Sequence, residues 1–273
     1  MKRLNTFAVA SLVFAMTVMS GGVAGANPVI TNGLVAAYPF NGNADDWSGN
    51  GNNGVVNGAT LTADRFGNPN SAYSFDGVDD YIVSSTTFLP QASGTIALWY
   101  NQLGIFPTDQ FVGSRSTQGY QPGDFMFGTN PFSNEPGACY WGNAGSWHCA
   151  EGHTVDELTF AITSDWHSVV WTWDTSNDEA FFYINDELVG TAGATLPIFG
   201  SLPLQVGRHT GAGAPPSYFH GNLDDVYIYD RALSASEVQT LFSSVPEPST
   251  AVLLWVGLAG LGMQRRRRTR REC

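Results

Sequence analysis

The central part of the chain is a series of short apolar segments separated by turn residues, and this pattern limits the possible folds more than any other feature. Segments of this length are typical of β-strands, and the Gly, Asn and Asp residues between them are typical of tight turns. The absence of helical segments between them argues against a parallel α/β sheet, so the pattern predicts an all-β sandwich or jelly roll. The expected strands are Leu34–Phe40, Ser71–Phe75, Tyr81–Ser84, Thr95–Tyr100, Gln110–Ser114, Asp124–Gly128, His167–Trp173, Ala180–Ile184, Glu187–Thr191, Leu204–Gly207 and Asn222–Tyr229.

Two local signals add detail to this fold. Asn185-Asp186 stands between two expected strands and predicts a tight hairpin turn. Ser234 and Glu237 have the spacing of a capping box, in which each side chain bonds the other residue's backbone amide. Apolar residues follow at the helical spacing of Val238 and Leu241. A short helix is therefore expected to close the domain.

The charge of the chain is unevenly distributed. Between residues 27 and 244 there are 22 acidic residues and four arginines, a formal charge of −18, and no lysine. A surface of this kind repels nucleic acid and anionic lipid and attracts cations. Nucleic-acid binding is excluded on this ground.

The same region contains two cysteines, Cys139 and Cys149. In an exported protein, two cysteines at this separation are expected to form a disulfide that closes a short loop. The alternative is a metal site that uses both thiols with His148 and His153, but the spacing matches no established zinc pattern.

The N-terminus has the features of a secretory signal peptide. Lys2 and Arg3 are followed by an uncharged apolar run, Phe7–Met19, and then by Ala24-Gly25-Ala26, the small-x-small pattern that signal peptidase cleaves. Cleavage after this pattern assigns residues 1–26 to the signal peptide. A permanent N-terminal anchor is the alternative, but the apolar run is short for a membrane span.

The C-terminus carries a second address. Pro246, Glu247 and Pro248 precede the apolar run Ala251–Met263, and an arginine cluster occupies 265–271. A basic block after an apolar run is a stop-transfer signal that remains on the cytoplasmic side. The run has 13 residues, against the ~20 that cross a bilayer core. A single membrane helix over about 250–264 would therefore be a weak anchor, suited to temporary residence, although an uncleaved tail anchor is the alternative.

This order of Pro-Glu-Pro, short apolar helix and arginine cluster closely resembles the PEP-CTERM sorting signal. The resemblance implies that an exosortase-type membrane peptidase recognises residues 245–273 and removes them. It also implies a biofilm or exopolysaccharide setting. The expected route is transient membrane insertion, an inner-membrane-anchored intermediate, and then the cell surface or the extracellular space.

Four segments of residues 27–244, called the body below, carry a second resemblance. In order they are Gly33–Phe40, Asp46–Gly54, Tyr73–Ile82 and Gly221–Ser234. The series resembles a LamG-like, concanavalin A-like lectin/glucanase domain and covers nearly all of residues 27–244. It implies two antiparallel sheets packed as a jelly roll. It does not fix the ligand, because this fold hosts lectins, adhesins and hydrolases alike.

The resemblance also implies a possible calcium site. Asp46 lies in a loop rich in Gly, Asn and Asp, and Asp224 and Asp225 form the closing acidic pair. Carboxylates and backbone carbonyls are the oxygen ligands that Ca²⁺ prefers, and the first and last strands of such sandwiches are neighbours. The alternative is that these residues only form turns. A second acidic segment, Asp76–Asp80, is interpreted as a hairpin turn between two strands, and a binding role is the alternative.

Aromatic residues gather around the two cysteines, within an insertion over Phe132–His153. Those proposed to contact a sugar are Tyr140, Trp141, Trp147 and His148. Aromatic faces on a disulfide-closed loop can stack on sugar rings while their polar tips hydrogen-bond. The alternative is that these rings cap the core of the sandwich.

No catalytic pattern is found. Glucanases of this fold typically carry Glu-x-Asp-x-x-Glu on one strand, and the adjacent acidic pairs here point to opposite faces of their strands. The sequence therefore predicts an exported, non-enzymatic module that recognises a polysaccharide or another surface glycan, with calcium as the expected cofactor. The alternatives are a structural or adhesive matrix protein and, less favoured, a glycan hydrolase.

Overall fold

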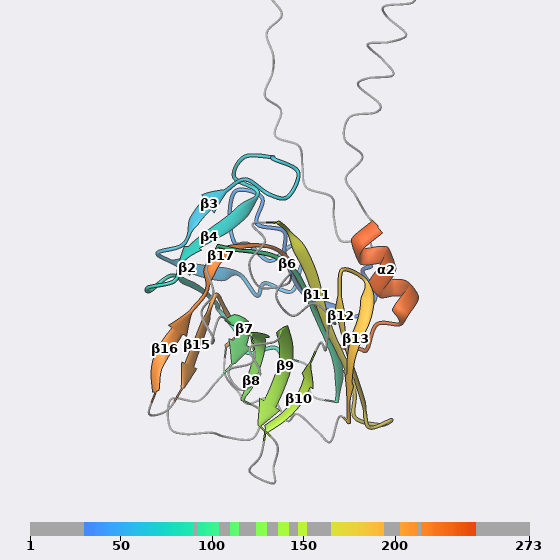
Figure 1. Cartoon of the computed structure of the whole chain (residues 1–273). Helices are drawn as coiled ribbons and strands as arrows, with labels where there is room; N and C mark the ends of the chain where they lie inside the picture. The colour runs from blue at the N-terminus through green and yellow to red at the C-terminus, as the bar shows by residue number, and fades with distance from the viewer. Residues whose placement is uncertain are drawn as a thin grey trace, which may run out of the picture.

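The protein is a two-sheet antiparallel β-structure with one short helix, as its computed structural model shows (Figure 1). The structure describes residues 30–89, 92–103, 110–114, 124–129, 136–141, 147–151, 165–193, 203–211 and 214–243. The expected all-β sandwich is confirmed. The predicted signal peptide and the predicted membrane helix both lie outside the described residues. Within the described part of the chain, no helix is both long enough and apolar enough to cross a membrane.

The larger sheet has eight strands in the order β13-β12-β11-β6-β17-β4-β3, and β1 pairs with β17. Every pairing in it is antiparallel. The strands are β1 (Leu34–Tyr38), β3 (Thr60–Thr62), β4 (Ala72–Asp76), β6 (Ser93–Gln102), β11 (His167–Asp174), β12 (Glu179–Ile184), β13 (Glu187–Ala192) and β17 (His220–Tyr229). The first and last strands of the body are therefore neighbours, as expected.

The smaller sheet has seven strands in the order β10-β9-β8-β7-β14-β5-β2. A separate two-stranded ribbon pairs β15 with β16. The strands are β2 (Gly54–Asn57), β5 (Tyr81–Ser84), β7 (Gln110–Ser114), β8 (Phe125–Thr129), β9 (Pro136–Trp141), β10 (Trp147–Glu151), β14 (Gln205–Val206), β15 (Arg208–Gly211) and β16 (Ala214–Tyr218).

An aromatic core joins the two sheets. Trp171 and Trp173 of β11 are buried, and their ring centroids lie 4.7 Å apart. Trp171 also lies 6.0 Å from Phe125 and 6.5 Å from Phe127, which both belong to β8 of the other sheet. Gly94 stands opposite Trp173 in the ladder, and a Cβ there would lie 2.2 Å from the indole ring. Glycine at this position therefore leaves room for the indole ring of Trp173.

Part of the outer face of the larger sheet is covered by helix α2 (Ala235–Ser243), which Figure 1 shows beside β12 and β13. Val238 and Leu241 pack with Tyr183 and Tyr227 in a second apolar cluster on this face. The predicted capping box is confirmed, since the Ser234 amide donates to Glu237 at 2.9 Å and the Glu237 amide donates to the Ser234 hydroxyl at 3.3 Å. The helix therefore begins where the sequence predicts.

Glu237 makes stability depend on pH. Arg231 donates to its two carboxylate oxygens at 2.9 and 2.6 Å, which, together with the Ser234 amide, lowers the pKa of Glu237 from 4.5 to about 2. Because the folded pKa is the lower one, this stabilisation is present above pH 4.5 and is lost as the pH falls toward 2. We expect Glu237→Gln to lower the free energy of unfolding by about 1 kcal/mol near neutral pH. The cost should shrink in acid, as measured by urea unfolding at several pH values. Glu187→Gln, at an exposed site, is the control, and a cost of Glu237→Gln that stayed constant with pH would contradict the assignment.

Two local interpretations are tested by the sheet order. The Asn185-Asp186 turn is confirmed: both residues have positive φ, 49° and 66°, and they join the paired strands β12 and β13. The hairpin interpretation of Asp76–Asp80 is wrong. β4 before it belongs to the larger sheet and β5 after it belongs to the smaller one. The segment is therefore a corner at which the chain crosses between sheets, which local sequence cannot distinguish from a hairpin.

The insertion expected over Phe132–His153 is also different from the prediction. It contains two strands, β9 and β10, which extend the smaller sheet to its edge. The many small and polar residues of this segment obscure the strand pattern, and pairing with β8 supplies the missing order.

Candidate functional site

Asp46 organises the first loop of the sandwich. Its Oδ1 accepts hydrogen bonds from the amides of Ala37 and Ser48, each at 2.9 Å. Its Oδ2 accepts from the Ser48 hydroxyl and the Asn52 amide, each also at 2.9 Å. A carboxylate has about four acceptor positions, so these four donors use all of them. Asp46 therefore ties its loop to β1.

Asp224 and Asp225 lie side by side on β17 and share one arginine. Arg65 Nη1 is 3.0 Å from Asp224 Oδ2 and 2.7 Å from Asp225 Oδ2. Burial, and then the charge of Asp225, raise the pKa of Asp224 well above its usual value, while Arg65 opposes this shift. Sequence reasoning missed Arg65. The available signal was the scarcity of basic residues, because each of only four arginines in so acidic a body is a strong candidate for a buried ion pair.

The three predicted calcium ligands do not come together in one group. Among the described residues, the only set of three or more metal-ligating side chains whose ligand atoms all lie within 4.8 Å of one another is Asp76, Asp79 and Asp80. Calcium binding by this chain stays a prediction, and the residues it named have other partners.

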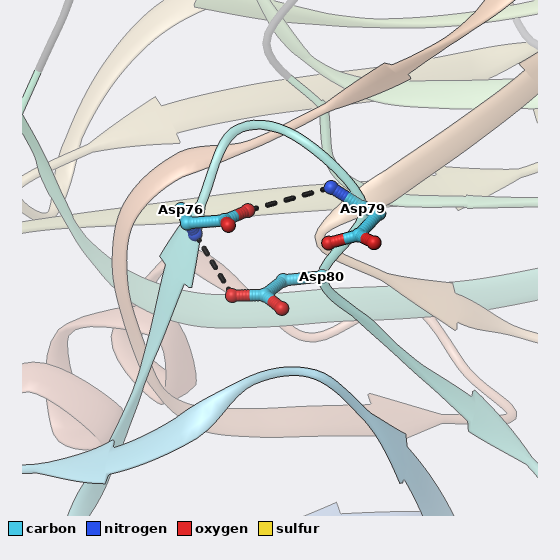
Figure 2. Close-up of side chains that lie close together, drawn as sticks. All are labelled: Asp76, Asp79 and Asp80. Atoms are coloured by element: carbon cyan, nitrogen blue, oxygen red, sulfur yellow. Dashed lines mark hydrogen bonds between the residues drawn. The ribbon is translucent and has the colours of Figure 1, made fainter.

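The acidic corner of Asp76, Asp79 and Asp80 is held together by its own backbone (Figure 2). The Asp76 amide donates to Asp80 Oδ2 at 3.0 Å, and Asp76 Oδ1 accepts from the amides of Val78 and Asp79 at 2.8 and 3.4 Å. Asp80 is buried, and this burial raises its pKa. These contacts explain the acidic residues as parts of a corner that joins the two sheets.

The aromatic residues expected to contact a sugar occupy the hairpin of β9 and β10. Trp141 pairs with Trp147, and Tyr140 pairs with His148, at directly opposite positions. Cys139 is buried and stands opposite Cys149 in the same ladder. The side chains of the four aromatic residues lie outside the described part of the structure. Their backbones place all four at one edge of the smaller sheet, where β10 lies next to β13 of the larger sheet.

Three solved structures share this architecture. Domain 4 of AbnA, an extracellular GH43 arabinanase from Geobacillus stearothermophilus solved with arabinotriose, has a TM-score of 0.61 at 19% identity, and the match covers 76% of this chain and 97% of that one. The binding domain of Paraclostridial Mosquitocidal Protein 1 has a TM-score of 0.58 at 18% identity and coverages of 78% and 52%. The botulinum neurotoxin serotype D ligand-binding domain with N-acetylneuraminic acid has a TM-score of 0.57 at 12% identity and coverages of 78% and 51%.

These similarities concern the fold, since all three identities are low, and this chain spans about half of each toxin domain. A search of curated protein sequences finds no match. Two family models do match. The concanavalin A-like lectin/glucanases model covers residues 76–239, more than half of the chain, and the PEP-CTERM protein-sorting motif covers residues 244–268. The chain therefore belongs to the concanavalin A-like lectin/glucanase superfamily and carries a PEP-CTERM sorting motif behind its sandwich.

Proposed function

We propose that the body of this protein is a non-enzymatic module that binds a glycan outside the cell. The observation that carries the proposal is the pairing of Trp141 with Trp147 at the edge of a concanavalin A-like sandwich. Two aromatic residues at opposite positions of neighbouring strands are close enough to form one stacking surface. AbnA domain 4, which has this fold, was solved with a bound arabinotriose.

The alternation of strands favours the two tryptophans over the other aromatic residues. Ala138 of β9 belongs to the core between the sheets. Residues two apart on a strand share a face, so Tyr140 has the parity of Ala138, and its partner His148 has the same parity. Trp141 and Trp147 have the opposite parity. We therefore assign the sugar contact to Trp141 and Trp147.

The charge of the body favours a neutral glycan. Two of the arginines that the structure describes are already paired with carboxylates, Arg65 with Asp224 and Asp225, and Arg231 with Glu237. A formal body charge of −18 repels uronate, sulfate and sialate groups at long range. A neutral oligosaccharide avoids this repulsion, and its hydroxyls can bond to the many Asn, Asp and Ser side chains.

A disulfide between Cys139 and Cys149 would stabilise this hairpin, and we propose that it forms in the exported protein. Its support is the register, which sets the two residues directly opposite, at a separation that suits disulfide geometry. Peptide mapping without reduction should recover the two cysteines in one linked fragment, and separate free thiols would refute the bond.

Export and sorting complete the proposal. The PEP-CTERM motif supports recognition by an exosortase-type peptidase. We propose that residues 250–264 insert into the inner membrane as a temporary anchor, and that cleavage then delivers the body to the surface or the extracellular matrix. Mass spectrometry of surface protein is expected to find the arginine cluster removed, and an intact tail would contradict cleavage.

The test of the main proposal is a glycan screen with the purified exported protein, run with calcium and with a chelator. We expect binding to neutral oligosaccharides, weaker binding to acidic ones, and no release of reducing sugar. No binding in either condition would favour a structural or adhesive matrix role. Release of reducing sugar that is lost when a body carboxylate is replaced would instead indicate a hydrolase.

A further inference from the structure

The Asp224–Asp225 pair sits at a break in β17. Along one side of this strand, His220–Leu223 pairs with β4 and Val226–Tyr229 pairs with β1, so the two aspartates lie where these two partners meet. On the other side the register against β6 shifts between Asp224 and Tyr227, which marks a β-bulge. Asp225 has a φ of 50° and is the extra residue.

This bulge keeps both carboxylates out of the core. Leu223 and Val226 both belong to the core between the sheets, although strict alternation would give them opposite faces. The extra residue shifts the inward and outward alternation of β17 by one position, so Leu223 and Val226 both face the core. Asp224 and Asp225, which lie between them, are neighbours outside that core. One oxygen of each carboxylate accepts a hydrogen bond from β17 itself. Asp224 Oδ1 accepts from the Asp225 amide at 2.8 Å, and Asp225 Oδ1 accepts from the Tyr227 hydroxyl at 2.7 Å. The two oxygens left over both face Arg65.

The guanidinium of Arg65 is fixed from several directions. Its Cζ lies 4.5 Å from the ring centroid of Phe66 and 4.5 Å from that of Trp99, which are cation–π distances. Asp64 shapes the loop that presents Arg65, because its Oδ1 accepts from the amides of Phe66 and Asn68, each at 2.8 Å. The Arg65 side chain is only 11% exposed, and Asp224 is 3% exposed. The ion pair is therefore largely desolvated.

Calcium does not fit the residue set expected for it. The acceptor positions of Asp46 are filled by four protein donors. Asp224 and Asp225 already hold a cation, and a divalent ion could not share their facing oxygens with a guanidinium without strong repulsion. Two adjacent carboxylates nonetheless require a positive partner, because a buried charge without one is very costly.

We propose that Arg65 is the permanent built-in cation of the Asp224–Asp225 pair. It occupies the place where a divalent cation was expected, and it makes the closing strand of the sandwich independent of calcium. Loss of Arg65 then leaves two facing carboxylate oxygens beside Trp99, and this vacated pair takes a divalent cation.

The experiment compares the wild type, Arg65→Met and Arg65→Lys, each with and without Asp225→Asn, by thermal unfolding in EDTA and in millimolar calcium. Methionine keeps the apolar contacts of the arginine stem but removes the charge, and lysine keeps a charge. The calcium effect at this pair is the part of the shift in Tm that Asp225→Asn abolishes. Calcium bound elsewhere raises the Tm equally with and without Asp225→Asn, so its contribution cancels in the difference.

We expect Arg65→Met to lower the Tm in EDTA by about 10 °C. Calcium at ~100-fold excess over its Kd should then restore about 5 to 10 °C, and Asp225→Asn should remove this gain. The wild type and Arg65→Lys should show no gain that depends on Asp225. A calcium-induced rise in Tm that depends on Asp225 in the wild type would overturn the proposal. The absence of such a rise in folded Arg65→Met would also overturn it.

A second measurement decides the question if Arg65→Met does not fold. Terbium occupies calcium sites, and its luminescence is excited through a nearby indole, here Trp99. Wild-type protein and its Asp225→Asn variant should give the same tryptophan-excited terbium signal, because Arg65 keeps the ion away from this pair. A wild-type signal that Asp225→Asn abolishes would show the ion bound beside Arg65 and would refute the proposal.

Discussion

Replacing Trp171 by alanine is expected to lower the free energy of unfolding by about 3 to 5 kcal/mol, the usual range for removing a buried large aromatic side chain. Trp171 is 1% exposed. It contacts Trp173 on its own strand and Phe125 and Phe127 on β8 of the opposite sheet. Its loss would therefore leave a cavity between the sheets. Urea unfolding followed by far-ultraviolet circular dichroism would measure the change.

Two controls separate a cavity from a loss of aromatic stacking. Trp171→Phe should cost less, because it keeps a ring between β11 and β8. Trp47→Ala removes an indole that is 37% exposed in the first loop and should change stability by about 0.5 kcal/mol or less. Equal losses for Trp47→Ala and Trp171→Ala would contradict the assigned role of Trp171 in joining the sheets.

Much of the fold could be predicted because its strands are short apolar segments separated by turn residues. In β6, Ile96, Leu98 and Tyr100 face the core between the sheets and Ala97 faces the helix-covered side, so both faces are buried and the apolar run is continuous. Capping residues and the Asn185-Asp186 turn are local signals with a direct physical cause, so they too were predictable. The helix and this hairpin lie where those signals place them.

The parts that were not predicted depend on contacts distant in the chain. Strands β9 and β10 lack a clear alternation, and they are ordered by pairing with β8. The corner at Asp76–Asp80 resembles a hairpin until the partners of β4 and β5 are known. Arg65 is 159 residues from Asp224 in sequence, and no local pattern relates the two.

The bulge in β17 has a signal in the sequence itself. Leu223 and Val226 are both core residues but are separated by two aspartates, which a regular strand does not allow. Two adjacent acids between two buried apolar residues therefore indicate a bulge and, in a body with four arginines, a buried ion pair. In the structure, the closing acidic pair forms this ion pair with Arg65.

Replacing Trp141 or Trp147 by alanine is expected to weaken binding of a neutral oligosaccharide by about 10- to 30-fold, the loss typical of a tryptophan at the centre of an interface. The two residues stand opposite each other on β9 and β10, so their effects should not be additive. The double variant should retain less binding than either single variant. Isothermal titration with the best ligand of the glycan screen would measure these changes.

The matched control is Trp47→Ala, which removes a partly exposed tryptophan that belongs to the first loop and not to the β9–β10 hairpin. It should leave the affinity within about twofold, because peripheral contacts contribute little to binding. The Tm of each variant must stay close to that of the wild type, so that a loss of binding reports the surface and not the hairpin. Folded Trp141→Ala and Trp147→Ala proteins with unchanged affinity would remove these residues from the site. In that case the glycan must be held by another part of the sandwich.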